Sequence, residues 1–131
     1  MLFVVKNSQV TERYGYYYMV KFGVIGAGRI GKVHTESICL HIKNAKIKTL
    51  ADPFMTEETA EWAKSLGVEQ TVKDYHEILN DPEIDAVMIC SSTNTHSPIS
   101  IEAIQAGKHV FCEKPIDHDL GKIKEVVKAL E

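Results

Sequence analysis

A glycine-rich turn with the sequence GAGRIG occupies Gly26–Gly31, directly after a short apolar run and before a helical pattern. Gly26 permits a tight turn, Gly28 lets a backbone approach a pyrophosphate closely, and Gly31 lets a helix pack closely on a strand. The amino end of that helix presents N–H groups and a partial positive charge to the phosphates, with Arg29 and Ile30 in its first turn. On its own the pattern is unspecific. Glycine turns also occur for structural reasons, and methyltransferases use a related loop for an adenosyl cofactor.

An acidic residue follows at the spacing that a dinucleotide site requires. Asp52 lies 21 residues beyond Gly31, at the end of the next predicted strand. An acid about 20 residues on hydrogen-bonds the 2′-hydroxyl of an adenosine ribose. The three residues after Asp52 carry no positive charge, and a carboxylate repels a 2′-phosphate, so NAD is preferred over NADP. The structural alternative is a turn aspartate before Pro53.

Two later loops follow predicted strands and should reach the same edge of the sheet, where ligands of doubly wound sheets bind. The first is a run of hydroxyl, amide and imidazole groups able to contact ribose and phosphate oxygens: Ser91, Ser92, Thr93, Asn94 and His96. The alternative is a polar surface loop in which Thr95 caps the following helix.

The second loop begins with Glu113, Lys114 and Pro115. Charges directly after a buried apolar strand are costly unless they are paired or face a ligand cleft. Lys114 is therefore a candidate to bind a substrate hydroxyl and help move its proton, because desolvation weakens the hold of a lysine on its own proton. A purely structural lysine remains the alternative. A cis Lys114–Pro115 bond is compatible with this turn.

The elements that must position these residues alternate between strands and helices. Apolar periodicity and caps predict strands over 22–25, 45–51, 68–72, 86–90 and 109–112. Helices are predicted over 29–42, 56–66, 74–80, 95–107 and 120–131, with Thr56 and Thr95 as amino caps and Gly67 and Gly107 as stops. This order predicts an α/β fold, a Rossmann-type doubly wound parallel sheet in a single domain.

Residues 1–18 do not join this alternation, so the predicted domain spans residues 19–131, with 1–18 as an extension of uncertain structure. Met19 stands just before the first predicted strand and is a candidate for the original start. The run with Tyr14, Tyr16, Tyr17 and Tyr18 is then a misassigned start, an added β-ribbon or an aromatic patch for a partner.

Composition describes an ordinary globular chain of 131 residues with net charge −3 and 44% hydrophobic residues. No basic excess attracts nucleic acid, and no apolar run approaches the ~20 residues of a membrane helix. We therefore expect a cytoplasmic location without nucleic-acid or membrane partners. Cys39, Cys90 and Cys112 lie in apolar segments and read as reduced core residues. The six histidines show no metal-ligand spacing, so no metal site is predicted.

Four segments together carry a family resemblance: GVIGAGRIGKVH at 23–34, AD at 51–52, SSTNTHSP at 91–98 and HVFCEKPI at 109–116. They resemble the glucose–fructose oxidoreductase, inositol dehydrogenase and rhizopine catabolism (Gfo/Idh/MocA) family over nearly all of 19–131. Inositol 2-dehydrogenases are the most similar members. The EKP tripeptide disfavours the methyltransferase alternative.

The resemblance implies that the glycine turn contacts the pyrophosphate, that Asp52 holds the adenosine ribose, and that 91–96 line the middle and nicotinamide side of the cofactor. Glu113 and Lys114 would lie beside the nicotinamide ribose and substrate, with Lys114 as the catalytic candidate. The other acid/base residues of the family belong to a C-terminal α+β substrate domain. We expect that domain, and the sixth Rossmann strand, to be absent from this chain.

Two functions remain open at this point. The first is the NAD-binding domain of an oxidoreductase that transfers hydride between a secondary alcohol of a polyol or sugar and NAD, inactive as this chain alone. The second is a non-catalytic dinucleotide-binding fragment or a sensor of cofactor redox state. Family members are commonly oligomeric through the domain expected to be absent, so self-association of this chain stays an open expectation.

Overall fold

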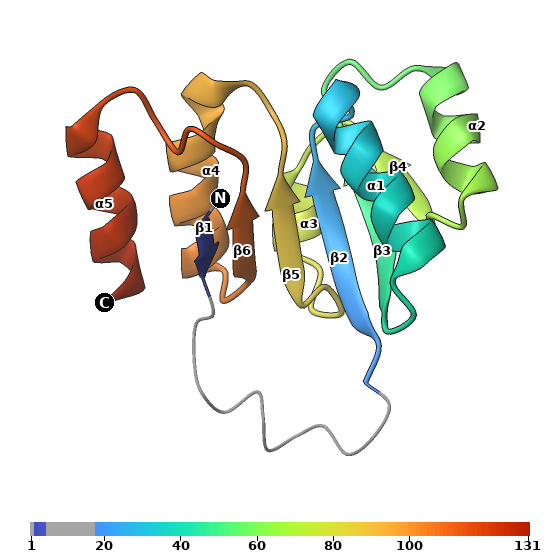
Figure 1. Ribbon diagram of the computed structural model, residues 1–131, viewed down its shortest axis with the longest axis horizontal. Coiled ribbons are helices and arrows are strands. Elements are labelled where there is room, and N and C mark those ends of the chain that lie inside the picture. Colours follow the sequence, from blue (N-terminus) through green and yellow to red (C-terminus); the bar gives the residue numbers. More distant parts are fainter. Residues whose placement is uncertain (1, 5–17) are drawn as a thin grey trace.

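The computed structural model describes residues 2–4 and 18–131 of the chain. Within these residues, six strands form one sheet in the order β1-β6-β5-β2-β3-β4 (Figure 1). Five of them are mutually parallel: β2 (Val20–Ile25), β3 (Ala45–Ala51), β4 (Gln70–Val72), β5 (Ala86–Ile89) and β6 (His109–Cys112). The chain moves outward from β2 to β3 and β4 on one side, then returns to β5 and β6 on the other. The predicted doubly wound parallel sheet is therefore confirmed.

Helices connect these strands: α1 (Arg29–His41), α2 (Glu57–Ser65), α3 (His76–Leu79), α4 (Thr93–Gln105) and α5 (Leu120–Leu130). The strands expected at 45–51 and 109–112 match their predicted bounds. The expected cap of the fourth helix is wrong, because α4 begins at Thr93 and Ser92 occupies the cap position. The hydroxyl of Thr95 donates instead to the Ser92 carbonyl at 2.6 Å, inside the first turn.

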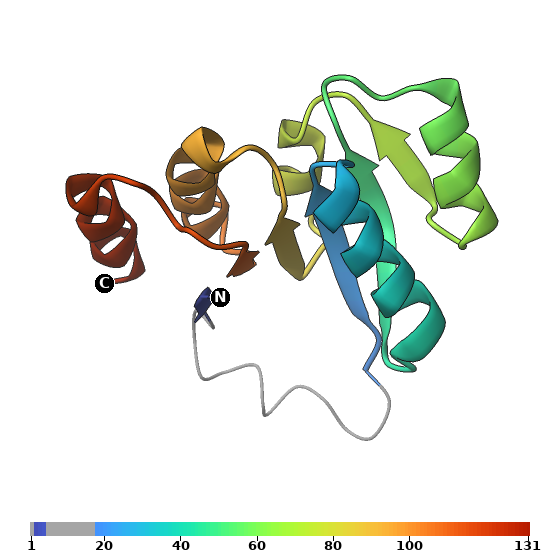
Figure 2. The same cartoon turned by 45° about the horizontal axis from the view of Figure 1, so that its top comes forward.

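Two hydrophobic layers enclose the sheet, one on each face, because neighbouring strand residues point in opposite directions. On β2, Val24 packs in the layer beneath α1 and α2, whereas Ile25 packs in the layer that α3, α4 and α5 cover. Figure 2 shows α1 on one side of the sheet and α3 and α4 on the other. Burial on both faces explains why the central strands read as continuous apolar runs.

The apolar residues of α1 are not all directed at the core. Thr35 and Ile38 are buried, whereas Ile30 is 42% exposed and Val33 is 49% exposed. Apolar periodicity predicted α1 correctly, but Ile30 and Val33, which fit this periodicity, face outward. Both line the cavity described below.

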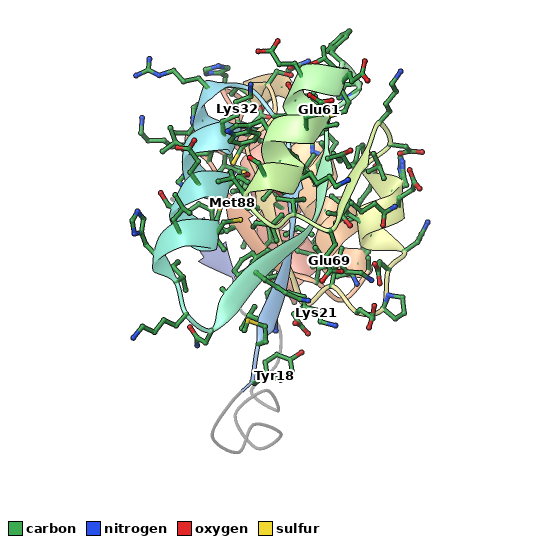
Figure 3. The ribbon with its side chains drawn as sticks, turned by 90° about the vertical axis from the view of Figure 1, so that its right-hand side faces the viewer. Tyr18, Lys21, Lys32, Glu61, Glu69 and Met88 are labelled. Atoms are coloured by element: carbon green, nitrogen blue, oxygen red, sulfur yellow. The ribbon has the colours of Figure 1, made fainter. Side chains whose placement is uncertain are left out.

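Part of the segment before Met19 belongs to the sheet. β1 (Leu2–Val4) pairs antiparallel with β6, with Leu2 opposite Cys112. Tyr18 donates to Asp85 at 2.5 Å, and Asp85 also accepts the Lys21 N–H at 2.9 Å. Figure 3 shows Tyr18 at the foot of β2. The expected aromatic cluster at Tyr14, Tyr16 and Tyr17 lies outside the described residues.

The cysteines are free thiols, with Cys90 and Cys112 buried and Cys39 half-buried, as predicted for core residues. Burial raises the pKa of Cys90 to about 12, so this thiol stays neutral. Across residues 2–4 and 18–131, no helix is both long and apolar enough to cross a bilayer.

Candidate functional site

A cavity of about 870 Å³ opens at the carboxyl ends of the parallel strands, the upper edge of the sheet in Figure 1. Its walls come from the segments that follow β2, β3, β4 and β5, together with the start of α1. The lining residues are Ile25, Gly26, Gly28, Arg29, Ile30, Val33, Ala51, Asp52, Pro53, Phe54, Lys73, Tyr75, Cys90, Ser91, Ser92, Thr95 and Ile99. This is the edge at which doubly wound sheets bind their ligands.

The glycine turn is shaped by contacts that only glycine permits at two of its three positions. Gly26 has φ +103°, and a Cβ there would lie 2.7 Å from the backbone of Cys90 and Ser91. A Cβ on Gly31 would lie 1.9 Å from the Gly26 carbonyl oxygen. Gly28 has φ −74° and open space at its Cβ position. Gly26 and Gly31 therefore serve the fold, whereas the surface beside Gly28 is free for a ligand to approach.

Two of the helices that begin at this edge and border the cavity, α1 and α4, lack side-chain caps. Gly28 precedes α1 and Ser92 precedes α4, and neither helix has a capping side chain or an acid in its first turn. By contrast, Thr56 caps α2 by accepting the Thr59 N–H, and Asp119 caps α5 by accepting the Gly121 N–H. No capping side chain thus competes with an anion at the start of α1 or α4, although the Thr95 N–H of α4 already donates to the Ser92 carbonyl oxygen at 2.9 Å.

The Asp52 carboxylate lies against the glycine turn. Its Oδ2 accepts the Ala27 N–H at 2.8 Å, and its Oδ1 accepts the Phe54 N–H at 2.8 Å. These bonds fix the carboxylate between the β2–α1 turn and the segment after β3. Each carboxylate oxygen can accept about two hydrogen bonds, so acceptor capacity remains toward the cavity.

Sequence reasoning missed several residues of this cavity, most importantly Lys73, Tyr75 and Phe54. Lys73 and Tyr75 follow β4, so the rule that located Asp52 after β3 would also have located them. No cationic residue directly follows Asp52 in the sequence, as noted above. In the folded chain, however, the cationic side chains of Lys73 and Arg29 line the same cavity as Asp52. Phe54 is 87% exposed and offers a flat apolar surface at its mouth.

Only some of the predicted cofactor-binding residues in the loop after β5 line the cavity. Ser91 and Ser92 line it, and Ser91 shares a 2.7 Å hydrogen bond with the hydroxyl of Thr95. Thr93 and Asn94 form the first residues of α4 and do not line the cavity. His96 is 2% exposed and also lies outside the lining.

The loop after β6 carries Glu113 and Lys114, which do not line the cavity. His34 of α1 donates from Nε2 to Glu113 Oε1 at 2.5 Å, and this bond holds the pKa of Glu113 below its usual value. The His34 ring also meets Phe111 edge to face at 5.7 Å. Glu113 Oε2 accepts the Lys114 N–H at 3.2 Å, and the Lys114–Pro115 bond is cis. Glu113 thus links α1 to the backbone of Lys114.

The described residues contain no cluster of three or more histidine, cysteine or acidic side chains placed to hold a metal ion. The cavity therefore offers backbone N–H groups, hydroxyls, one carboxylate and two cationic side chains. This set suits phosphate and ribose groups.

A doubly wound sheet with a glycine turn and an acid at the end of the second parallel strand defines a Rossmann-type dinucleotide-binding domain. Residues 20–131 match the model of the oxidoreductase family described as GFO_IDH_MocA, NAD-binding Rossmann fold. The chain belongs to this family, and the resemblance read from its motifs is confirmed.

Several relatives are inositol dehydrogenases. The chain is 42% identical over 109 residues to myo-inositol 2-dehydrogenase of Thermotoga maritima, covering 83% of this chain and 32% of that protein. It is 40% identical over 111 residues to inositol 2-dehydrogenase of Rhizobium meliloti, covering 85% and 32%. A Lactobacillus casei scyllo-inositol dehydrogenase structure with bound NAD(H) and scyllo-inositol superposes with a TM-score of 0.78 at 35% identity, covering 86% and 33%. The chain thus spans about a third of the length of these relatives.

Substituting two glycines separates the structural part of the turn from its open part. Gly31→Ala places a methyl group against the Gly26 carbonyl, so we expect a loss of about 1–3 kcal/mol in the free energy of unfolding. Gly28→Ala meets no atom within 4 Å, and we expect a change below about 1 kcal/mol. Denaturant unfolding of both variants measures the difference, and equal losses would contradict this account of the turn.

The acid dependence of stability should report on Glu113. Because its folded pKa is lowered, mainly by the hydrogen bond from His34, its contribution is present above the unfolded pKa and lost as pH falls through the folded pKa. Glu113→Gln should lower stability at neutral pH by about 1 kcal/mol and flatten the acid limb of the stability curve. Glu125→Gln on the exposed side of α5 is the control. Identical acid limbs for both variants would show that Glu113 contributes nothing.

Proposed function

We propose that the cavity binds NAD(H), with the pyrophosphate on the amino end of α1 and the adenosine ribose on Asp52. The observation that carries this proposal is the pairing of an open Gly28 surface with a carboxylate held against the same turn. Gly26, Arg29 and Ile30 complete the phosphate side, while Gly31 supports them by letting α1 start close to Gly26. Phe54 would border the adenine.

We also propose a preference for NAD over NADP. Asp52 retains acceptor capacity for ribose hydroxyls, and its charge opposes a 2′-phosphate at the same position. Arg29 and Lys73 also line the cavity, and their positive charges would favour the 2′-phosphate of NADP. Asp52 decides the preference in this proposal, because its carboxylate is fixed by two backbone N–H groups whereas long cationic side chains must lose rotamer freedom to bind.

The nicotinamide half would then extend toward the loops after β5 and β6. In the proposal, Ser91, Ser92, Thr93 and Asn94 bind the middle of the cofactor, and Glu113 and Lys114 flank the nicotinamide ribose and the substrate. When bound, NAD would supply the hydride acceptor for oxidation of a secondary alcohol. Lys114 would bind the alcohol oxygen and help move its proton. A polyol or sugar, in particular an inositol, is the proposed substrate of the whole protein, since several relatives are named inositol dehydrogenases.

A second function is a dinucleotide-binding chain that does no chemistry by itself. One observation favours it: Lys114, the proposed acid/base residue, does not line the cavity, and neither does any histidine of the described residues. Such a chain would bind the cofactor as a sensor or as part of a larger assembly. Self-association through an exposed surface is compatible with either function.

Cofactor binding can be tested by thermal unfolding in the presence of NADH or NADPH. At a ligand concentration one hundred times the Kd, binding adds about 2.7 kcal/mol, so NADH should raise the Tm by several degrees and NADPH by less. Asp52→Ala should reduce the difference between the Tm shifts that NADH and NADPH cause. Glu61→Gln on α2, which does not line the cavity, is the control (Figure 3). Equal shifts with both ligands in the unmodified chain would refute the assigned preference.

Catalysis should be absent from the 131-residue chain alone. Oxidation of an alcohol needs a base within reach of its proton, and the cavity of the described residues holds no histidine and does not include Lys114. We expect no NADH absorbance when the chain is mixed with NAD and either myo-inositol or scyllo-inositol. Thermotoga maritima myo-inositol 2-dehydrogenase serves as the positive control. Inositol-dependent NADH formation by the chain would refute the expectation.

A further inference from the structure

His96 links the two loops that follow β5 and β6. It lies in the first turn of α4, and its side chain is buried at 2% exposure. Its Nδ1 lies 2.7 Å from the Pro115 carbonyl oxygen, and its Nε2 lies 2.8 Å from the Ser91 carbonyl oxygen. Ser91 lines the cavity and Pro115 directly follows Lys114. The ring therefore bridges the proposed phosphate and nicotinamide sides of the site.

The two partners of His96 have the same chemistry, and this restricts the state of the ring. A backbone carbonyl oxygen only accepts hydrogen bonds, and a neutral imidazole has only one N–H to donate. A neutral ring would therefore direct one nitrogen lone pair at a carbonyl oxygen less than 3 Å away. An imidazolium donates from both nitrogens and satisfies both contacts.

We propose that His96 is an imidazolium in the folded protein and acts as a positioning residue that holds the β5 and β6 loops together. Both bonds are then charge-assisted, which makes them stronger than bonds between neutral groups. The proton on His96 fixes the separation between Ser91 and Pro115, and with it the distance from the glycine edge of the cavity to Lys114. The effect on cofactor binding rests on the proposed NAD(H) function, whereas the protonation state does not.

Charges around His96 come from several elements. In the sequence, Glu113, Lys114, Asp117 and His118 flank its Pro115 contact in the loop after β6, and His34 of α1 is bonded to Glu113. The loop after β5 carries no charged side chain between 91 and 95. The carboxylates of this set favour a cation, whereas the other cationic groups and the amino end of α4 oppose it. In the proposal, the carbonyl oxygens of Ser91 and Pro115 favour the imidazolium, because both lie within hydrogen-bond distance of the ring nitrogens.

A second contact joins the same helix and loop without a histidine. Ser97, the next residue of α4, donates to Asp117 Oδ2 at 2.6 Å, and this bond helps to keep the pKa of Asp117 low. Because this bond persists when His96 is changed, the loop after β6 keeps one anchor to α4. Loss of the imidazolium should loosen the loop rather than unfold the domain.

Nitrogen-15 NMR of the imidazole rings tests the protonation state directly in the full 131-residue chain. The His96 signals are assigned by their disappearance in His96→Gln. We expect both ring nitrogens of His96 to be protonated at neutral pH. A His96 ring with a single protonated nitrogen at neutral pH would overturn the proposal. No cofactor enters this measurement.

NADH titration across about pH 5 to 9, the range in which histidine charge matters, tests the positioning role. In the unmodified chain, the Kd for NADH should rise as pH increases and the His96 proton is lost. His96→Gln should weaken binding about tenfold or more at neutral pH, because it removes the two charge-assisted bonds that hold the loops together. This variant should also lose the pH dependence. His41→Gln should match the unmodified chain in both respects.

The two measurements distinguish the failure of each proposal. An imidazolium at His96 with no NADH binding by the unmodified chain would refute the proposed function and leave the protonation proposal standing. NADH binding that His96→Gln leaves unchanged in strength and pH dependence would overturn the positioning role. A pH-dependent affinity that survives in His96→Gln would assign the dependence to another group and would overturn it as well.

Discussion

The contact between the β2–α1 turn and the ends of the neighbouring strands is the constraint on which the site depends. At Gly26 the turn passes so close to Cys90 and Ser91 that no side chain fits between them. On its other side, Asp52 accepts the Ala27 N–H, and the Gly26 N–H donates to Ala51 at 2.8 Å. The turn is thus held between β3 and β5, with its remaining face open. Because Gly31 lets α1 begin against Gly26, the uncapped end of that helix opens onto the cavity.

Local sequence signals predicted much of this fold because the same residues serve local and global structure. The strand at 45–51 supplies Ile47 and Leu50 to one hydrophobic layer and Ala51 to the other, and Thr56 caps the helix that follows it. The start of α4 was misjudged for a physical reason. Thr95 and Ser92 are both good caps by residue type, so residue type alone does not decide between them, and the helix begins after Ser92. The pairing of β1 with β6 could not be predicted, because it joins residues that are far apart in sequence.

The residues of the candidate site also divide into those that local sequence signals predict and those that they do not. Residues that bind through backbone geometry, such as Gly26 and Gly28, were identified because glycine spacing records backbone constraints directly. Lys73 and Tyr75 were missed although they follow a predicted strand, because a single lysine and a single tyrosine form no motif of fixed spacing. Ile30 and Val33 fit the apolar periodicity of a helix, yet they line the cavity. Apolar periodicity identifies a helix but does not separate a core face from a ligand-facing one.

Lys114 shows how the fold positions a residue outside the cavity wall. Two histidines on different helices contact its neighbours on either side: His34 of α1 bonds the Glu113 side chain, and His96 of α4 contacts the Pro115 carbonyl. Glu113 also accepts the Lys114 N–H, so the Lys114 backbone is tied to helices on both faces of the sheet. A lysine carried on a free loop would lose its position through backbone motion, however favourable its side-chain chemistry. The backbone of Lys114 is therefore fixed before any ligand binds, and only its side chain has to be ordered by what occupies the site.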